Sequence, residues 1–169
     1  MKASLAITLS CCVLSAAVAR ADWPNWRGPS SDGSLAEAAT PTEFGPEKNL
    51  KWKVDLPGRG CSTPVVWGER MFLTGPIGEE DGIMALDLAG KELWRKTVGK
   101  AMAGKKGRTG SSANSSPITD GERVYAFFKS GNLAAFTMEG KELWKVNIWE
   151  DYGENKLWWD YGTSPVLAG

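Results

Sequence analysis

The sequence predicts an all-β fold, a β-propeller of four-stranded antiparallel blades, and three observations lead to this prediction. The pentapeptide Gly-Lys-Glu-Leu-Trp occurs twice, at residues 90–94 and 140–144, and a Gly-Glu-Arg tripeptide precedes each copy, at residues 68–70 and 121–123. Short apolar runs separated by turn residues lie between the two motifs, as expected for short strands in a repeat. The inner run at residues 83–88 is apolar on both faces, which a sheet needs only when it is packed on both sides, as in a stack of blades.

Residues 1–21 are expected to be a secretory signal peptide and not a part of the fold. Lys2 is a short basic start, residues 5–18 are largely apolar, and Ala19-Arg20-Ala21 has the small residues of a cleavage site. The mature chain would then begin at Asp22, without a transmembrane segment, in the periplasm or outside the cell. The 20 basic and 20 acidic residues of the whole chain balance, so charge gives no reason to expect nucleic acid as a partner.

Residues 22–49 are predicted to form an extended N-terminal lead-in, because proline, glycine, serine and alanine are frequent there. Its two tryptophans, Trp23 and Trp26, are expected to cover an apolar edge of the domain. This segment therefore contributes no blade of its own.

The propeller repeats are assigned to residues 50–169, and they open with a strand that has no blade. Residues 50–56 alternate apolar and polar side chains, which is the period of a half-buried strand. This stretch matches the end of each full repeat, since Trp52 stands where the repeats have Trp94 and Trp144. In a closed propeller it would be a closing strand that completes the last blade.

The first full blade is expected at about residues 62–110. Its four strands are predicted at residues 63–67, 70–74, 83–88 and 92–98. The loop at residues 75–82 contains Glu79, Glu80 and Asp81. Because the alternating ligands of an EF-hand are missing, these carboxylates are interpreted as a solvated turn and not as a Ca²⁺ site.

The second blade is expected at about residues 115–162. Its strands are predicted at residues 116–119, 123–129, 133–138 and 142–148. The distance from Gly121 to Gly140 is 19 residues, against 22 from Gly68 to Gly90, and the hairpin between the second and third strands can absorb this difference. A third blade would start at residue 163. About two blades plus a closing strand make an incomplete propeller, so the sequence is interpreted as the N-terminal part of a longer protein that would be prone to association if isolated.

The repeated motifs resemble the pyrroloquinoline-quinone-like (PQQ-like, quinoprotein-type) β-propeller repeat family. The resemblance rests on Ser/Thr-Pro-Val-Val, on Ala85-Leu86-Asp87 and on Gly-Lys-Glu-Leu-Trp, and it covers roughly residues 50–169. The second copy departs from it, with Ala135-Phe136-Thr137 in place of Ala-Leu-Asp. In this family the repeated tryptophan docks neighbouring blades, so the resemblance implies a structural docking role for Trp52, Trp94 and Trp144.

The family implies two kinds of protein. Some members are dehydrogenases of alcohols or sugars that hold PQQ and Ca²⁺ on the propeller axis. Others, similar to the lipoprotein subunit of the outer-membrane barrel-assembly machinery, bind no cofactor and act as protein-binding scaffolds. The vicinal cysteines typical of the alcohol dehydrogenases are not expected here, because the adjacent pair Cys11-Cys12 lies in the signal peptide.

Within this sequence no residue is assigned to catalysis or to metal binding, and no cofactor is evident. The chain has no histidine, which removes imidazole bases and histidine-ligated metals from the segment. The best candidates for a ligand or partner site lie in the links between blades, which cross one face of a propeller and end at the mouth of the axis. They are small polar and aromatic residues: Ser62, Asn114, Ser115, Trp158, Trp159, Tyr161, Thr163 and Ser164.

The link between the second and third blades is rich in aromatic residues, because Trp149 and Tyr152 precede the three already named. These side chains are expected to cover a blade edge; alternatively, they could stack a small planar ligand or anchor a protein partner in the cell envelope. The leading hypothesis is a non-catalytic binding or scaffold role in the periplasm or cell envelope. The alternative is a PQQ-dependent dehydrogenase whose catalytic and Ca²⁺ residues lie beyond this sequence.

Overall fold

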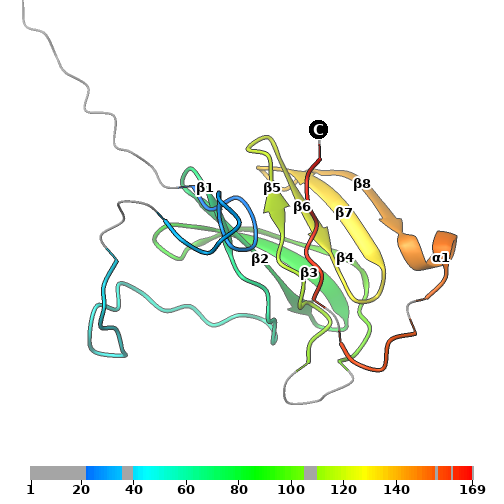
Figure 1. Ribbon diagram of the computed structural model, residues 1–169, viewed down its shortest axis with the longest axis horizontal. Helices are drawn as coiled ribbons and strands as arrows, with labels where there is room; N and C mark the ends of the chain where they lie inside the picture. Colours follow the sequence, from blue (N-terminus) through cyan, green and yellow to red (C-terminus); the bar gives the residue numbers. More distant parts are fainter. Residues whose placement is uncertain (1–21, 36–39, 105–109, 155, 161, 169) are drawn as a thin grey trace, which may run out of the picture.

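The chain forms two β-sheets side by side (Figure 1), in a computed structural model that describes residues 22–35, 40–104, 110–154, 156–160 and 162–168. The expected signal peptide and Tyr161 lie outside these residues. Within the described ranges, no helix is long and apolar enough to cross a membrane.

Each sheet has four antiparallel strands in sequence order. The first contains β1 (Val65–Trp67), β2 (Arg70–Ile77), β3 (Glu80–Asp87) and β4 (Glu92–Lys100). The second contains β5 (Ile118–Thr119), β6 (Arg123–Phe127), β7 (Asn132–Thr137) and β8 (Glu142–Asn147), followed by the short helix α1 (Ile148–Tyr152). The predicted fold class is confirmed: the protein is all-β, and the two sheets are successive blades of an incomplete propeller.

The length difference between the two repeats lies in the hairpin that joins the second and third strands of each blade. Phe72 pairs with Ala85, 13 residues later, whereas Tyr125 pairs with Ala135, 10 residues later. The extra residues lengthen the strands instead of forming a loop, because β2 and β3 have eight residues each, against five in β6 and six in β7. The interpretation of residues 79–81 as a solvated turn is therefore wrong for Asp81, which is fully buried in β3.

Residues 50–56 have no strand conformation in this structure, so the closing strand predicted there stays a prediction. The alternating pattern predicts a strand only if a neighbouring strand pairs with it, and within the described residues β4 lies at one edge of the first sheet and β1 at the other. Trp52 nevertheless packs where an outer strand of a preceding blade would place it. Its indole N–H donates to the carbonyl of Leu88 at 2.9 Å.

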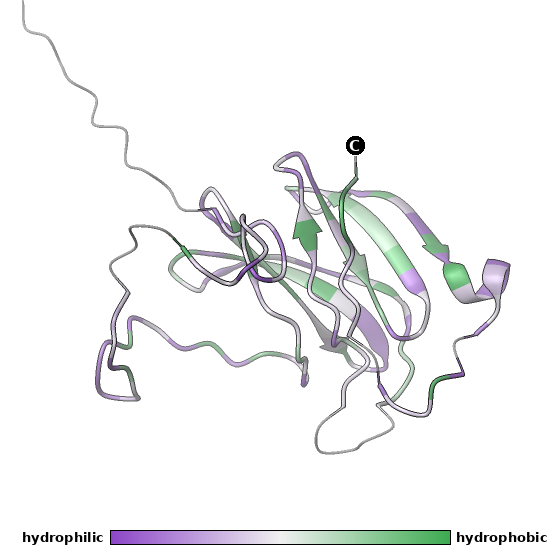
Figure 2. Ribbon diagram, in the orientation of Figure 1, coloured by the Kyte–Doolittle hydropathy of each residue, from purple (hydrophilic) through white to green (hydrophobic). Residues whose placement is uncertain are grey.

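The main core lies between the two blades, where the facing strands carry apolar side chains (Figure 2). Trp94 lies between Phe72 and Phe136, with ring centroids 5.9 and 6.1 Å away. Its indole N–H donates to the carbonyl of Met138 at 3.0 Å. A Cβ at Gly140, whose φ is +84°, would approach the indole to 2.6 Å, so only glycine fits under the ring.

Trp52 repeats this arrangement on the first blade. Leu88 precedes Gly90 by two residues, as Met138 precedes Gly140, and a Cβ at Gly90 would lie 2.7 Å from the Trp52 ring. Trp144 has no such cover: it is 42% exposed and contacts Tyr125 at 6.2 Å between ring centroids. The docking role of the three tryptophans thus stays a prediction, with matching contacts at Trp52 and Trp94.

Candidate functional site

The lead-in bonds the innermost strand of each blade at one end of the molecule. Trp23 forms a two-way backbone pair with Val66, in which each N–H donates to the other's carbonyl at 2.8 Å. Pro24 accepts from the N–H of Thr119 in β5 at 2.9 Å. The lead-in therefore crosses from blade to blade at this end, and Trp26 stays 55% exposed instead of covering an apolar edge.

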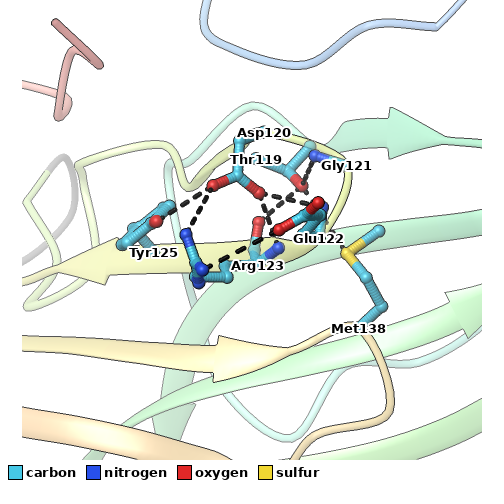
Figure 3. Close-up of polar contacts among 7 residues, drawn as sticks. All are labelled: Thr119, Asp120, Gly121, Glu122, Arg123, Tyr125 and Met138. Carbon is cyan, nitrogen blue, oxygen red and sulfur yellow. Dashed lines mark hydrogen bonds and ion pairs between the residues drawn. The ribbon is translucent and has the colours of Figure 1, made fainter. Parts of the chain in front are cut away.

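The β5–β6 turn at this end is held by a compact polar network (Figure 3). The carboxylate of Asp120 accepts from the backbone N–H groups of Glu122 at 2.9 Å and Arg123 at 2.6 Å, and from the Tyr125 hydroxyl at 3.0 Å. Burial by itself would raise the pKa of Asp120, but these hydrogen bonds and the charge of Arg123 lower it below its ordinary value. Both carboxylate oxygens of Asp120 accept hydrogen bonds from residues of the turn and of β6. Asp120 therefore stabilises the fold and has little remaining capacity to accept hydrogen bonds from a ligand.

A cavity of about 790 Å³ lies between the lead-in, β5 and the segment that follows residue 161. The indole of Trp67, Ile118 and Pro165 line it, and the candidates Thr163 and Ser164 also reach it. Most of its lining is apolar, so it offers shape and surface to a ligand but few polar groups to orient one.

Hydroxyl groups link successive repeats beside this cavity. The backbone N–H of Thr63 donates to Oγ of Ser116 at 2.9 Å, and the N–H of Ser116 donates to Oγ of Ser164 at 3.0 Å. Each of these residues stands directly before a proline, at Pro64, Pro117 and Pro165. Sequence reasoning missed Thr63 and Ser116, although their shared place before the repeated proline was the signal.

The other small polar candidates make different hydrogen bonds from Ser164. The hydroxyl of Ser62 exchanges hydrogen bonds with the backbone of Thr74, at 3.0 and 3.2 Å, and Thr74 Oγ1 donates to the carbonyl of Ser115 at 2.9 Å. Among the described residues, Asn114 Oδ1 and Ser115 Oγ are buried without a hydrogen-bond partner. The structure thus brings Ser62 and Ser115 together through Thr74, and their ligand role stays a prediction.

A buried carboxylate joins the two blades. Oδ2 of Asp81 in β3 accepts from the Ser130 hydroxyl and from Asn132 Nδ2, the latter at 2.9 Å, both in the β6–β7 region of the other blade. Burial is the dominant effect and raises the pKa of Asp81 above its ordinary value. The neighbouring groups of Ser130, Asn132 and Ser112 act in the opposite direction and lower this pKa, although Ser112 Oγ makes no hydrogen bond of normal geometry.

The aromatic link after β8 is tied at both ends to one residue, Lys129. Near its start, the indole N–H of Trp149 donates to the carbonyl of Lys129 at 2.9 Å. Near its end, Oδ1 of Asp160 pairs with Lys129 Nζ at 2.5 Å, and both side chains are at least 95% buried, with 3% and 5% exposed. Lys129 Nζ also donates to the carbonyl of Ala103 in the preceding link, at 2.6 Å.

Between these two ties the link exposes its aromatic side chains. Tyr152 is 85% exposed, Trp158 65% and Trp159 46%, and the two tryptophan rings meet edge to face at 5.3 Å between centroids. The expectation that these three side chains cover a blade edge is wrong, because all three are exposed. Trp149, by contrast, packs on the second blade, over Gly131.

Among the described residues, no three His, Cys, Asp or Glu side chains gather into a group that could hold a metal ion. The buried carboxylate of Asp81 is surrounded by hydroxyl and amide groups and not by further carboxylates. We therefore assign no step of quinone chemistry to these residues.

A family model described as outer membrane protein assembly factor BamB matches residues 43–169. Among solved structures, the chain is similar to the quinohemoprotein alcohol dehydrogenase ADHIIG from Pseudomonas putida HK5, with 24% sequence identity and a TM-score of 0.43. That match covers 57% of this chain and 14% of the dehydrogenase, so the chain spans a small part of that protein's length. No curated protein matched the sequence.

Proposed function

This chain belongs to the family of the outer membrane protein assembly factor BamB, and we propose that it is an exported, non-catalytic scaffold that binds a protein partner in the periplasm or cell envelope. The family match confirms the PQQ-like propeller repeats predicted from the sequence. The family includes both enzymes and binding proteins, so membership alone does not decide between catalysis and partner binding.

The observation that supports the proposal is the exposure of three aromatic side chains in one link, Tyr152, Trp158 and Trp159. Tryptophan and tyrosine are enriched among the residues that dominate binding energy at protein interfaces, because they bury a large area and lose little conformational freedom. Here both ends of the link contact Lys129, one end through a part-buried hydrogen bond and the other through a buried ion pair. A partner would therefore meet aromatic side chains on a base that is already ordered.

The test compares partner capture by the unaltered protein and by a Trp158→Ala/Trp159→Ala variant, using solubilised envelope proteins of the source organism. We expect the double variant to lose a specific captured protein. Phe44→Ala is the matched control, because Phe44 is 81% exposed but lies in the lead-in. Equal capture by all three proteins would contradict the proposal.

A second measurement addresses the dehydrogenase alternative. The full-length protein is titrated with PQQ and Ca²⁺ while tryptophan fluorescence is recorded, and dye reduction is then followed with a panel of alcohols and sugars. We expect neither saturable binding nor turnover. Saturable binding with dye reduction would replace the scaffold function by an oxidoreductase.

A further inference from the structure

Residues 149–154 and 156–160 belong to a surface loop whose two ends contact a single residue, Lys129, and we call these residues the closed loop. Its first residue bonds the carbonyl of Lys129 and its last residue bonds the ammonium of Lys129. Compact surface loops whose ends lie close together are frequently functional, since their tips can vary while their ends stay fixed. In this protein one lysine on the β6–β7 turn supplies both contacts.

The start of the closed loop is ordered by more than this contact. Asn147 caps α1, because its Oδ1 accepts from the N–H of Trp149 at 3.0 Å. Asn147 Nδ2 in turn donates to the carbonyl of Ser130 at 3.2 Å. The Trp149 ring meets Phe127 edge to face at 6.2 Å between centroids. The exposed residues that follow are therefore presented from a fixed base at the margin of the second sheet (Figure 1).

The charges of the closed loop have one prevailing sign. Glu150, Asp151 and Glu154 are exposed, as is Lys156, so these four side chains carry a net charge of −2. The pair between Lys129 and Asp160 is neutral overall and buried, and it does not offset this charge. Acidic groups thus accompany the exposed aromatic rings along the same loop.

We propose that the closed loop binds a basic segment of the protein partner, one in which lysine or arginine alternates with apolar side chains. The inference rests on the scaffold function proposed above and names the chemistry of the partner. Carboxylates attract such a segment and fix its orientation. The faces of Trp158 and Trp159 accept guanidinium or ammonium groups by cation–π contact, and the apolar side chains cover the rest of the rings.

The test uses a synthetic ten-residue peptide of alternating arginine and leucine, with a glutamate–leucine peptide of equal length as its counterpart. Binding is measured by titration calorimetry at low and at moderate salt. We expect the arginine peptide to bind and the glutamate peptide not to bind. We also expect affinity for the arginine peptide to fall severalfold as salt rises, because exposed charges are screened beyond roughly 10 Å at 0.1 M ionic strength.

Two charge-reversal variants decide whether binding belongs to this loop. Glu150→Lys/Asp151→Lys should weaken binding of the arginine peptide by about tenfold or more. Glu47→Lys/Asp55→Lys changes the net charge by the same amount at exposed positions outside the loop. Its affinity for the arginine peptide should stay within about twofold of that of the unaltered protein. Equal affinity of the two variants, or no binding of the arginine peptide by the unaltered protein, would overturn the inference.

The two proposals fail in different ways. If the arginine peptide does not bind but Trp158→Ala/Trp159→Ala still abolishes capture of an envelope protein, the scaffold function stands and only the basic character of the partner is wrong. If the double tryptophan variant captures its partner normally, the scaffold function through this loop is wrong, whichever peptide binds.

Discussion

The two blades carry the same motifs, yet the same residue meets different surroundings in each. Trp94 of the first blade lies between Phe72 and Phe136 and donates to a carbonyl of the second blade. Trp144 of the second blade occupies the equivalent position and is 42% exposed. The repeat therefore encodes the shape of a blade, whereas burial of its tryptophan depends on the next blade.

The inner turns of the two blades differ in the source of their hydrogen bonds. In the second blade, the N–H of Gly121 donates to Thr119 Oγ1 at 3.0 Å, within the same turn. In the first blade, Val66 stands where the second has Thr119, and the N–H of Gly68 donates instead to Asp22 of the lead-in at 2.8 Å. The first blade thus depends on the lead-in for a bond that the second supplies itself.

The largest expected difference between the blades concerns their tryptophans. Trp94→Ala should lower the free energy of unfolding by about 3–5 kcal/mol, because it leaves a cavity in the core between the blades. Trp144→Ala should cost about 1 kcal/mol or less, since much of this ring already meets water. Urea unfolding followed by circular dichroism measures both values, and equal losses would contradict the unequal environments.

The next comparison concerns ion pairs. Lys129→Met should cost about 3 kcal/mol, because it removes a buried ammonium group that pairs with the buried carboxylate of Asp160. Arg95→Met in β4 removes an exposed pair with Glu92 and should cost about 1 kcal/mol or less. The two variants are compared by thermal unfolding, and a Lys129→Met protein as stable as Arg95→Met would show that the tie at Asp160 does not hold the link.

A smaller effect is expected at the lead-in. Asp22→Ala removes the acceptor for the N–H of Gly68 and should cost about 1 kcal/mol. Hydrogen exchange at the amide of Gly68 should become faster, while exchange at the amide of Gly121 stays unchanged, because the second blade caps its own turn. Faster exchange at both amides would mean that the lead-in holds the two blades as one unit.

The smallest effects should appear in the pH dependence of stability, where Asp81 and Asp120 act in opposite directions. The pKa of Asp120 is lowered in the folded protein. Its contribution to the free energy of unfolding is therefore present at pH values above the ordinary aspartate pKa of 3.8, and it is lost as pH falls through the folded pKa. The pKa of Asp81 is raised, so its contribution is present below 3.8 and is lost as pH rises through the folded pKa.

Urea unfolding between pH 3 and pH 7 separates the two carboxylates. Asp120→Asn should flatten the loss of stability on the acid side, and Asp81→Asn should flatten the loss that accompanies rising pH. If Asp81→Asn leaves the dependence of stability on pH unchanged, burial does not raise the pKa of Asp81 in the folded protein.

The blades could be predicted from the sequence because their signals are local and occur twice. The glycines beneath the indoles open the two copies of Gly-Lys-Glu-Leu-Trp, and the turn residues and apolar runs precede each copy in the same order. Burial of Asp81 could not be predicted in this way. It depends on the extension of the longer hairpin into strands and on partners, Ser130 and Asn132, that the other blade supplies.

The candidate site was predictable only in part, for a similar reason. The aromatic composition of the link is visible in the sequence, but its closure is not, because Lys129 lies in a turn 20 residues before Trp149 and 31 before Asp160. An aromatic residue in a link can cover a blade or face solvent. The choice between these two states is made by contacts at the ends of the link, and local patterns carry no information about them.

The hydroxyl contacts before the repeated prolines have a direction. Thr63 gives its N–H to Ser116, and Ser116 gives its own to Ser164, so each repeat donates forward and accepts from behind. A repeat duplicated between two others would accept from one neighbour and donate to the other, and no amide would lose its acceptor. Whole repeats can thus be gained or lost during evolution while this hydrogen bonding is conserved, which makes the number of blades free to change in steps of one.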